Sequence, residues 1–167
     1  MSKLLYREQQ AFRQPILIIL FSGMNILWLA GIIQQVILNK PFGTNPASDP
    51  GLIIIAVVII VMTILFFRIR MITEVRNDGV YYRFTLFQGK FRVITQPEIK
   101  TCEKMIYHPL KEYGGWGIKR KSRNDIAYSV SGNSGIRFML YSGKTVLIGT
   151  QRPDFFYGSV QSMMKRS

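Results

Sequence analysis

Two uncharged apolar runs near the start of the chain constrain its structure more than any other feature. They extend from Pro15 to Leu38 and from Gly51 to Phe67. As helices rising 1.5 Å per residue they would be about 36 Å and about 26 Å long, against a hydrocarbon core of about 30 Å. The first run is longer than the apolar core of a signal peptide, and a second run follows it directly. We therefore interpret both as transmembrane helices rather than as a cleaved leader.

Basic residues flank the outer ends of this helical pair and are scarce in its connecting loop. They are Lys3, Arg7 and Arg13 before the first run and Arg68, Arg70 and Arg76 after the second, whereas the loop has Lys40 and Asp49. The positive-inside rule then places both termini on the cytoplasmic side. The predicted organisation is a cytoplasmic segment at 1–14, transmembrane helices at 15–38 and 51–67, a non-cytoplasmic loop at 39–50 and a cytoplasmic domain at 68–167.

The charge of the chain indicates an acidic partner. The whole chain has 22 basic and 9 acidic residues, a net charge of +13, and most of the excess lies after the second run. A basic domain tethered to a bilayer is attracted to anionic lipid of the cytoplasmic leaflet or to an acidic protein surface. Lipid is the nearer polyanion, so no nucleic acid is expected. The single cysteine, Cys102, excludes an intrachain disulfide and fits a reducing compartment.

Beyond Arg68 the sequence alternates with a period of two, as strands do, and turn residues separate the alternating stretches. Pro153 and Asp154 then begin a segment with helix signals at both ends, and Phe156, Val160 and Met163 form an apolar stripe on it. We predict about seven antiparallel strands, forming a bent sheet or partly open barrel, with a C-terminal helix that covers one end. The alternating stretches that we interpret as strands are 69–76, 79–87, 91–97, 99–107, 115–120, 125–131, 135–141 and 144–149. We expect the first of them to continue the second transmembrane helix rather than to be a full strand, and we place the C-terminal helix at 155–166.

Several short motifs in this domain resemble a family. They are Glu112-Tyr-Gly-Gly-Trp-Gly-Ile118, Ala127-Tyr128, Gly132, Gly135-Ile136 and Ile148-Gly-Thr-Gln-Arg-Pro153. Together with the helical pair, they resemble an uncharacterised family of bacterial membrane proteins with two transmembrane helices and a pleckstrin-homology-like (PH-like) C-terminal domain. The resemblance covers roughly Arg68 to Met164. It implies a PH-like fold and a location in the bacterial cytoplasmic membrane, and it brings no reaction or catalytic residues.

The glycine-rich stretch around Trp116 and the basic run after it are the candidate contact surface. The glycines either bend the chain at a corner of the sheet or expose backbone and indole to a partner or to the lipid interface. The basic run is either a solvated turn or a contact for anionic lipid or an acidic protein. The candidate contact residues are Trp116, Lys119, Arg120, Lys121 and Arg123.

Within the first apolar run, small and polar residues are the candidates for helix–helix contact. A mid-membrane asparagine usually bonds to a neighbouring helix, here either within the pair or in another subunit. The candidate residues are Ser22, Gly23, Asn25 and Gly31.

The sequence has no constellation typical of catalysis. Cys102 and His108 are the only cysteine and histidine, no third group is placed to orient them, and two ligands do not complete a metal site. No glycine-rich phosphate loop occurs. We therefore expect no enzyme activity, no metal and no cofactor.

The sequence thus predicts a non-enzymatic, membrane-anchored binding or assembly module that presents a basic domain at the cytoplasmic membrane surface. Tethering would raise the effective concentration of the domain for a membrane-bound partner. The alternative is an accessory subunit of a larger membrane complex, such as a transporter or respiratory assembly, with the transmembrane helices as its interface. Its partner would be another membrane protein or a second copy of the chain. A lipid head-group enzyme is a third reading, disfavoured by the missing constellation.

Overall fold

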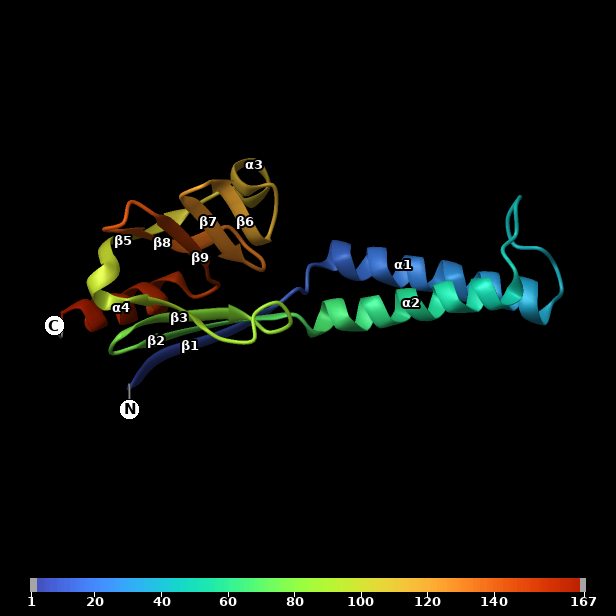
Figure 1. Cartoon of the computed structure of the whole chain (residues 1–167), viewed down its shortest axis with the longest axis horizontal. Coiled ribbons are helices and arrows are strands. Elements are labelled where there is room, and N and C mark those ends of the chain that lie inside the picture. The colour runs from blue at the N-terminus through green and yellow to red at the C-terminus, as the bar shows by residue number, and fades with distance from the viewer. Residues whose placement is uncertain (1–2, 166–167) are drawn as a thin grey trace. The chain divides into compact units, whose positions relative to one another are not determined.

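The structure is a computed structural model that describes residues 3–165, and the chain divides into two compact units (Figure 1). One unit is the helical segment Arg13–Arg68. The other combines the residues before it, up to Phe12, with those from Ile69 onward. The stretch that precedes the first apolar run therefore belongs to the β-rich unit.

The helical unit is a pair of packed helices. Helix α1 (Pro15–Ile32) continues into a short π-helical turn, η1 (Ile33–Ile37), and α2 (Asp49–Arg68) follows the connecting loop. Both helices are long and apolar enough to cross a membrane. Most of their large apolar side chains are exposed, which is the surface expected of helices in hydrocarbon and would promote aggregation in water.

The first sheet of the β-rich unit contains four antiparallel strands in the order β1-β2-β3-β4. They are β1 (Leu4–Ala11), β2 (Arg70–Arg76), β3 (Gly79–Phe84) and β4 (Arg92–Thr95). One expectation is wrong here. Residues 70–76 form a full interior strand rather than a continuation of the preceding helix, because β1 and β3 pair with its two edges. Residues 4–11, for which no element was predicted, form an edge strand.

The second sheet contains five strands in the order β5-β8-β9-β7-β6. They are β5 (Ile99–Ile106), β6 (Gly117–Ser122), β7 (Asp125–Ser129), β8 (Ser134–Leu140) and β9 (Thr145–Gly149). The expectation of about seven antiparallel strands is therefore corrected to nine strands in two sheets among residues 3–165. The pairing is not all antiparallel either, because β9 inserts between β8 and β7 and runs parallel to β7.

The remaining elements join and cover the sheets. A 3₁₀ turn, η2 (Gln96–Glu98), leads from the first sheet to the second, and a short helix, α3 (Pro109–Tyr113), follows β5. Helix α4 (Pro153–Met164) contacts β1 and β2 of one sheet and β5 and β8 of the other. The predicted C-terminal helix is confirmed, and its predicted stripe is buried: Phe156, Val160 and Met163 are all fully enclosed.

Candidate functional site

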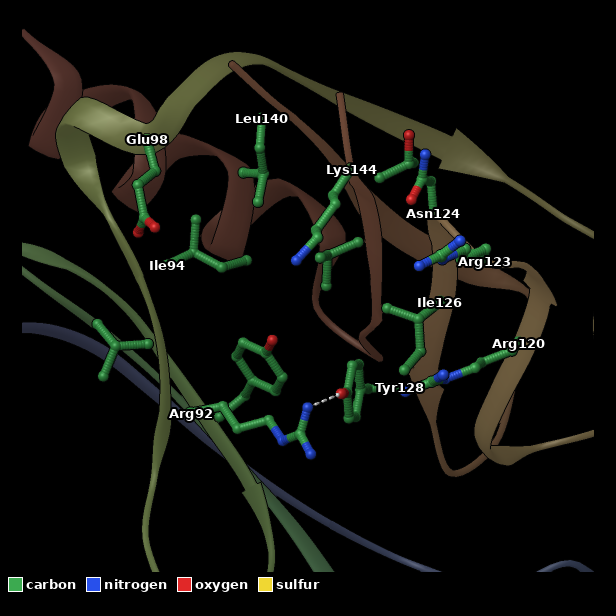
Figure 2. A pocket seen from close by; sticks show the side chains of 14 residues that line it. Arg92, Ile94, Glu98, Arg120, Arg123, Asn124, Ile126, Tyr128, Leu140 and Lys144 are labelled. Carbon is green, nitrogen blue, oxygen red and sulfur yellow. Dashed lines mark hydrogen bonds between the residues drawn. The ribbon is translucent and has the colours of Figure 1, made fainter. Parts of the chain in front are cut away.

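An open cleft of about 230 Å³ lies between the two sheets of the β-rich unit (Figure 2). One wall comes from β3, β4 and η2, and the other from β6, β7, the end of β8 and the start of β9. Apolar side chains contribute to both walls. Tyr82 of β3 and Tyr128 of β7 also line the cleft, and their rings are in contact. The polar groups that line it are mainly cationic: Arg92, Arg120, Arg123 and Lys144.

The four cations reach the cleft from separate parts of the chain. Arg92 begins β4, Arg120 lies on β6, Arg123 lies in the turn between β6 and β7, and Lys144 immediately precedes β9. Arg92 and Lys144 extend into the open space from different sides (Figure 2). Among residues 3–165, none of the four forms an ion pair with a carboxylate. The cleft therefore holds concentrated positive charge that the described part of the chain does not neutralise.

Arg92 is oriented by an aromatic pair at the base of the cleft. Its Nη1 donates to the hydroxyl of Tyr128 at 2.9 Å, and its guanidinium lies 5.7 Å from the centre of that ring. The ring of Tyr82 packs edge-on against Tyr128, with centroids 4.7 Å apart. Burial raises the pKa of both phenols, so they stay neutral hydroxyls and do not offset the cations.

Glu98 is the one carboxylate among the described residues that line the cleft, and it is hydrogen-bonded to Thr95, which lies outside the lining. Its Oε2 accepts hydrogen bonds from the backbone N–H and the hydroxyl of Thr95, each at 2.7 Å. The bond from the Thr95 backbone N–H is one half of the capping box of η2, and both bonds lower the pKa of Glu98. The carboxylate is therefore held at the 3₁₀ turn, and Figure 2 shows it on the side of the cleft away from Arg120 and Arg123.

The basic run Lys119–Arg123 is divided by the pleat of β6. Arg120 is paired with Ile126, and both line the cleft. Lys119 is paired with Ala127, which belongs to a buried cluster with Tyr107, Tyr113 and Leu147. Since neighbouring residues on a strand point to opposite faces, Lys119 lies on the face away from the cleft. Of the five predicted contact residues, only Arg120 and Arg123 line it.

Trp116 is half-buried, does not line the cleft, and is fixed to the turn between β7 and β8. Its Nε1 donates to the carbonyl of Gly132 at 2.9 Å. Gly114 ends α3 in a left-handed conformation, with φ of 72°, and Gly115 and Gly117 have φ of 125° and 110°. The glycines thus provide backbone conformations that other residues rarely adopt, and they turn the chain from α3 into β6. The structure does not bring Trp116 together with Arg120 and Arg123.

Cys102 and His108, considered above as a catalytic pair, serve different local contacts. The Sγ of Cys102 lies 3.8 Å from the sulfur of Met164 and accepts a hydrogen bond from Gln161 of α4, and burial raises the pKa of the thiol. His108 is exposed beyond the end of β5, where its backbone N–H donates to Glu112. Among residues 3–165 no group of three or more His, Cys, Asp or Glu is arranged to hold a metal ion.

The four candidates for helix–helix contact in the first apolar run differ in the contacts that they make. Asn25 Nδ2 donates to Thr63 Oγ1 of α2 at 3.0 Å and to the carbonyl of Phe21 at 2.7 Å, so its amide joins the two helices of the pair. Gly31 is buried against the ring of Phe42, and a Cβ there would lie 2.9 Å from that ring. The other two candidates, Ser22 and Gly23, are exposed on α1.

Replacing Asn25 by leucine is expected to weaken the helical pair by about 0.6–2 kcal/mol, because the Thr63 hydroxyl loses its partner in the other helix. Thr63→Val should cost a similar amount, and the double variant less than the sum of the two. A double-mutant cycle on unfolding of the full chain in detergent micelles measures this coupling. Ser22→Ala, an exposed change on the same helix, is the control, and strictly additive losses would contradict the bond.

Two of the four cleft cations and both of its aromatic residues were not identified from the sequence. Arg92 and Lys144 lie outside the dense basic run, in turn-rich sequence. Only the folded sheets bring them to the cleft, where Arg92 lies on one wall and Lys144 lies with Arg120 on the other. Tyr82 and Tyr128 fit an ordinary strand pattern. The one available signal was the alternation of β6, which separates Lys119 from Arg120.

One family model, described as a family of unknown function, matches residues 1–166 of the chain. This confirms the identification of the chain with an uncharacterised family. No curated protein and no solved structure gives a significant match. The function must therefore be argued from the residues of this chain.

Proposed function

The chain belongs to DUF6141, a family of unknown function, and from its own geometry we propose a non-enzymatic, membrane-anchored module that binds an anionic group in its basic cleft. The carrying observation is the set of four cleft cations that form no ion pair among residues 3–165. Concentrating like charges costs free energy, and an anionic ligand would repay that cost. A PH-like assignment of the β-rich unit is part of this proposal.

Short linkers support the anchoring part of the proposal. Three residues separate β1 from α1, and Ile69 alone separates α2 from β2. With the helices in a bacterial cytoplasmic membrane and both termini inside, as the flanking Lys and Arg residues indicate, the cleft would stay near the cytoplasmic surface. Tethering then favours ligands that are themselves at that surface.

The alternative, an accessory subunit whose helices form the main interface, has less support. The amide of Asn25, the most polar group of the first helix, bonds to Thr63 within the pair. The exposed surface of both helices is formed mainly by Ile, Leu and Val, which lipid solvates without a partner. We therefore give the cleft, rather than the helices, the binding role.

A photo-crosslinking amino acid at Asn124, which lines the cleft, tests this function in native membranes. The cleft variant is Arg120→Gln with Arg123→Gln and Lys144→Gln. The control is Lys111→Gln with Lys119→Gln and Lys121→Gln, three positions outside the cleft lining that change the net charge equally. We expect a discrete adduct with the native chain and the control, at least ten-fold reduced with the cleft variant.

The outcome separates a specific site from general charge attraction. Equal loss of the adduct in both variants would mean that net charge alone attracts the partner. Retention of the adduct in the cleft variant would remove the cleft cations from the binding role. Mass spectrometry of the adduct then distinguishes lipid from protein.

A further inference from the structure

The geometry points to a phosphate monoester as the anionic group that the cleft binds. This inference rests on the proposed function and names the ligand chemistry of the same site. It follows from three features of the cleft: the number of its charges, the directions from which they come, and the mixture of polar and apolar surface around them.

The charge balance favours a doubly charged ligand over a single carboxylate. The described lining residues carry four cations and one carboxylate, and that carboxylate is committed to Thr95. A carboxylate ligand would be satisfied by one guanidinium in a two-pronged contact. A phosphate monoester carries close to two negative charges at neutral pH and offers three terminal acceptor oxygens.

The placement of the cations suits a tetrahedral group. Arg92 comes from the first sheet, whereas Arg120, Arg123 and Lys144 come from the second. Donors on two walls can reach oxygens that point in different directions, as those of a phosphate do and those of a planar carboxylate do not. Three of the four cations are arginines, whose fixed forks match phosphate oxygens.

The size and the lining of the cleft limit what the phosphate is attached to. A space of about 230 Å³ admits a phosphate with a small organic group, but neither a folded acidic surface nor a nucleic-acid duplex. Leu140, Ile94, Ile126 and Val146 supply apolar surface among the cations. The shared ligand chemistry is thus a phosphate monoester on a compact carbon group, supplied either by a soluble ester or by a lipid with a terminal phosphate.

The pH dependence of binding is a direct consequence. The second pKa of a phosphate ester is near 6, so the dianion rises about ten-fold between pH 5 and pH 7.5. The charged groups facing the ligand are Arg92, Arg120, Arg123, Lys144 and Glu98. Glu98 has a lowered pKa, and Tyr82 and Tyr128 have raised pKa values, so none of these three changes charge in this range. Affinity for the ester should therefore rise about ten-fold, whereas affinity for sulfate should stay constant.

Isothermal titration of the full chain in neutral phosphatidylcholine nanodiscs tests this with glycerol 3-phosphate, sulfate and acetate. We expect glycerol 3-phosphate to bind with the stated pH rise, acetate to bind at least ten-fold more weakly at pH 7.5, and the Arg120/Arg123/Lys144→Gln variant to lose ester binding. The Lys111/Lys119/Lys121→Gln control should keep it. A second arm places phosphatidic acid, a terminal phosphate lipid, or phosphatidylglycerol, a diester, in the nanodisc and follows hydrogen exchange of residues 120–126.

The two arms identify the source of the phosphate. Ester binding in the first arm alone assigns a soluble ligand, and protection of 120–126 by phosphatidic acid but not by phosphatidylglycerol assigns a lipid. The inference is overturned if neither arm responds, if acetate binds as well as the ester, or if the cleft variant retains ester binding. If the crosslink at Asn124 still formed in that case, the proposed binding function would stand, and the bound anion would not be a phosphate monoester.

Discussion

Replacing Phe156 by alanine is expected to lower the free energy of unfolding of the β-rich unit by about 3–5 kcal/mol. Its side chain is fully buried on α4. The ring stacks on Tyr6 of β1, with centroids 5.4 Å apart, and lies 6.1 Å from Phe138 of β8. The substitution therefore leaves a cavity where α4 meets one strand from each sheet. Chemical denaturation of the full chain in detergent, followed by near-ultraviolet circular dichroism, measures the loss.

The neighbouring residue provides a matched control. Phe155 is 74% exposed on the same helix, so Phe155→Ala removes the same atoms without opening a cavity. It should change the free energy of unfolding by no more than about 0.5 kcal/mol. Alanine is the better helix former, so helix propensity cannot produce a loss in either variant. Similar losses from the two substitutions would therefore contradict the packing of Phe156 between the sheets as the source of its contribution.

The elements with strong local signals could be predicted from the sequence. Two uncharged runs gave the helical pair, and the stripe of Phe156, Val160 and Met163 gave α4, because each depends on periodicity within a single element. The assignment of 70–76 failed for the opposite reason. Five consecutive residues of β2 are buried, so the strand lacks an exposed face and its sequence resembles the preceding helix as much as a strand.

The site was harder to predict because strand pairing creates it. Arg92 and Lys144 join Arg120 only because β4 lies on one wall and β9 is inserted between β8 and β7. Local alternation gives no information on which strands become neighbours. The density of charge along the sequence therefore favoured Lys119 and Lys121, which do not line the cleft, over Arg92 and Lys144, which do.

The strand β1 was not predicted because its buried residues are polar. Glu8 and Gln10 are both enclosed, whereas a sequence pattern treats alternate polar residues as a solvent face. Gln10 Nε2 donates to the carbonyl of Gly149 at 2.9 Å, and Glu8 accepts from residues that follow β9. The N-terminal segment is thus held to the β9–α4 connection by hydrogen bonds over 139 to 143 positions of sequence, a relation that only the folded chain reveals.

Removal of the Glu8 carboxylate is the second large change that we expect. Its Oε2 accepts from the Thr150 hydroxyl at 2.6 Å, and its Oε1 accepts from the Gln151 backbone N–H at 2.9 Å. The hydroxyl of Tyr6 adds a third bond at 2.8 Å. Glu8→Ala leaves these donors unsatisfied, at about 1–3 kcal/mol for each one that stays buried, so we expect a total loss of about 2–5 kcal/mol.

The loss of stability should appear first in β1 and in the β9–α4 connection to which it bonds, because β1 is an edge strand paired only with β2 in its sheet. Hydrogen exchange of the full chain should accelerate in residues 4–11 and 150–152, with β7 and β8 little affected. Glu8→Gln keeps an acceptor oxygen and should lose less, and Gln9→Ala, an exposed neighbour on the same strand, should lose almost nothing. Unchanged protection of residues 4–11 in Glu8→Ala would show that strand pairing with β2 suffices to hold β1, and that the buried carboxylate has another role.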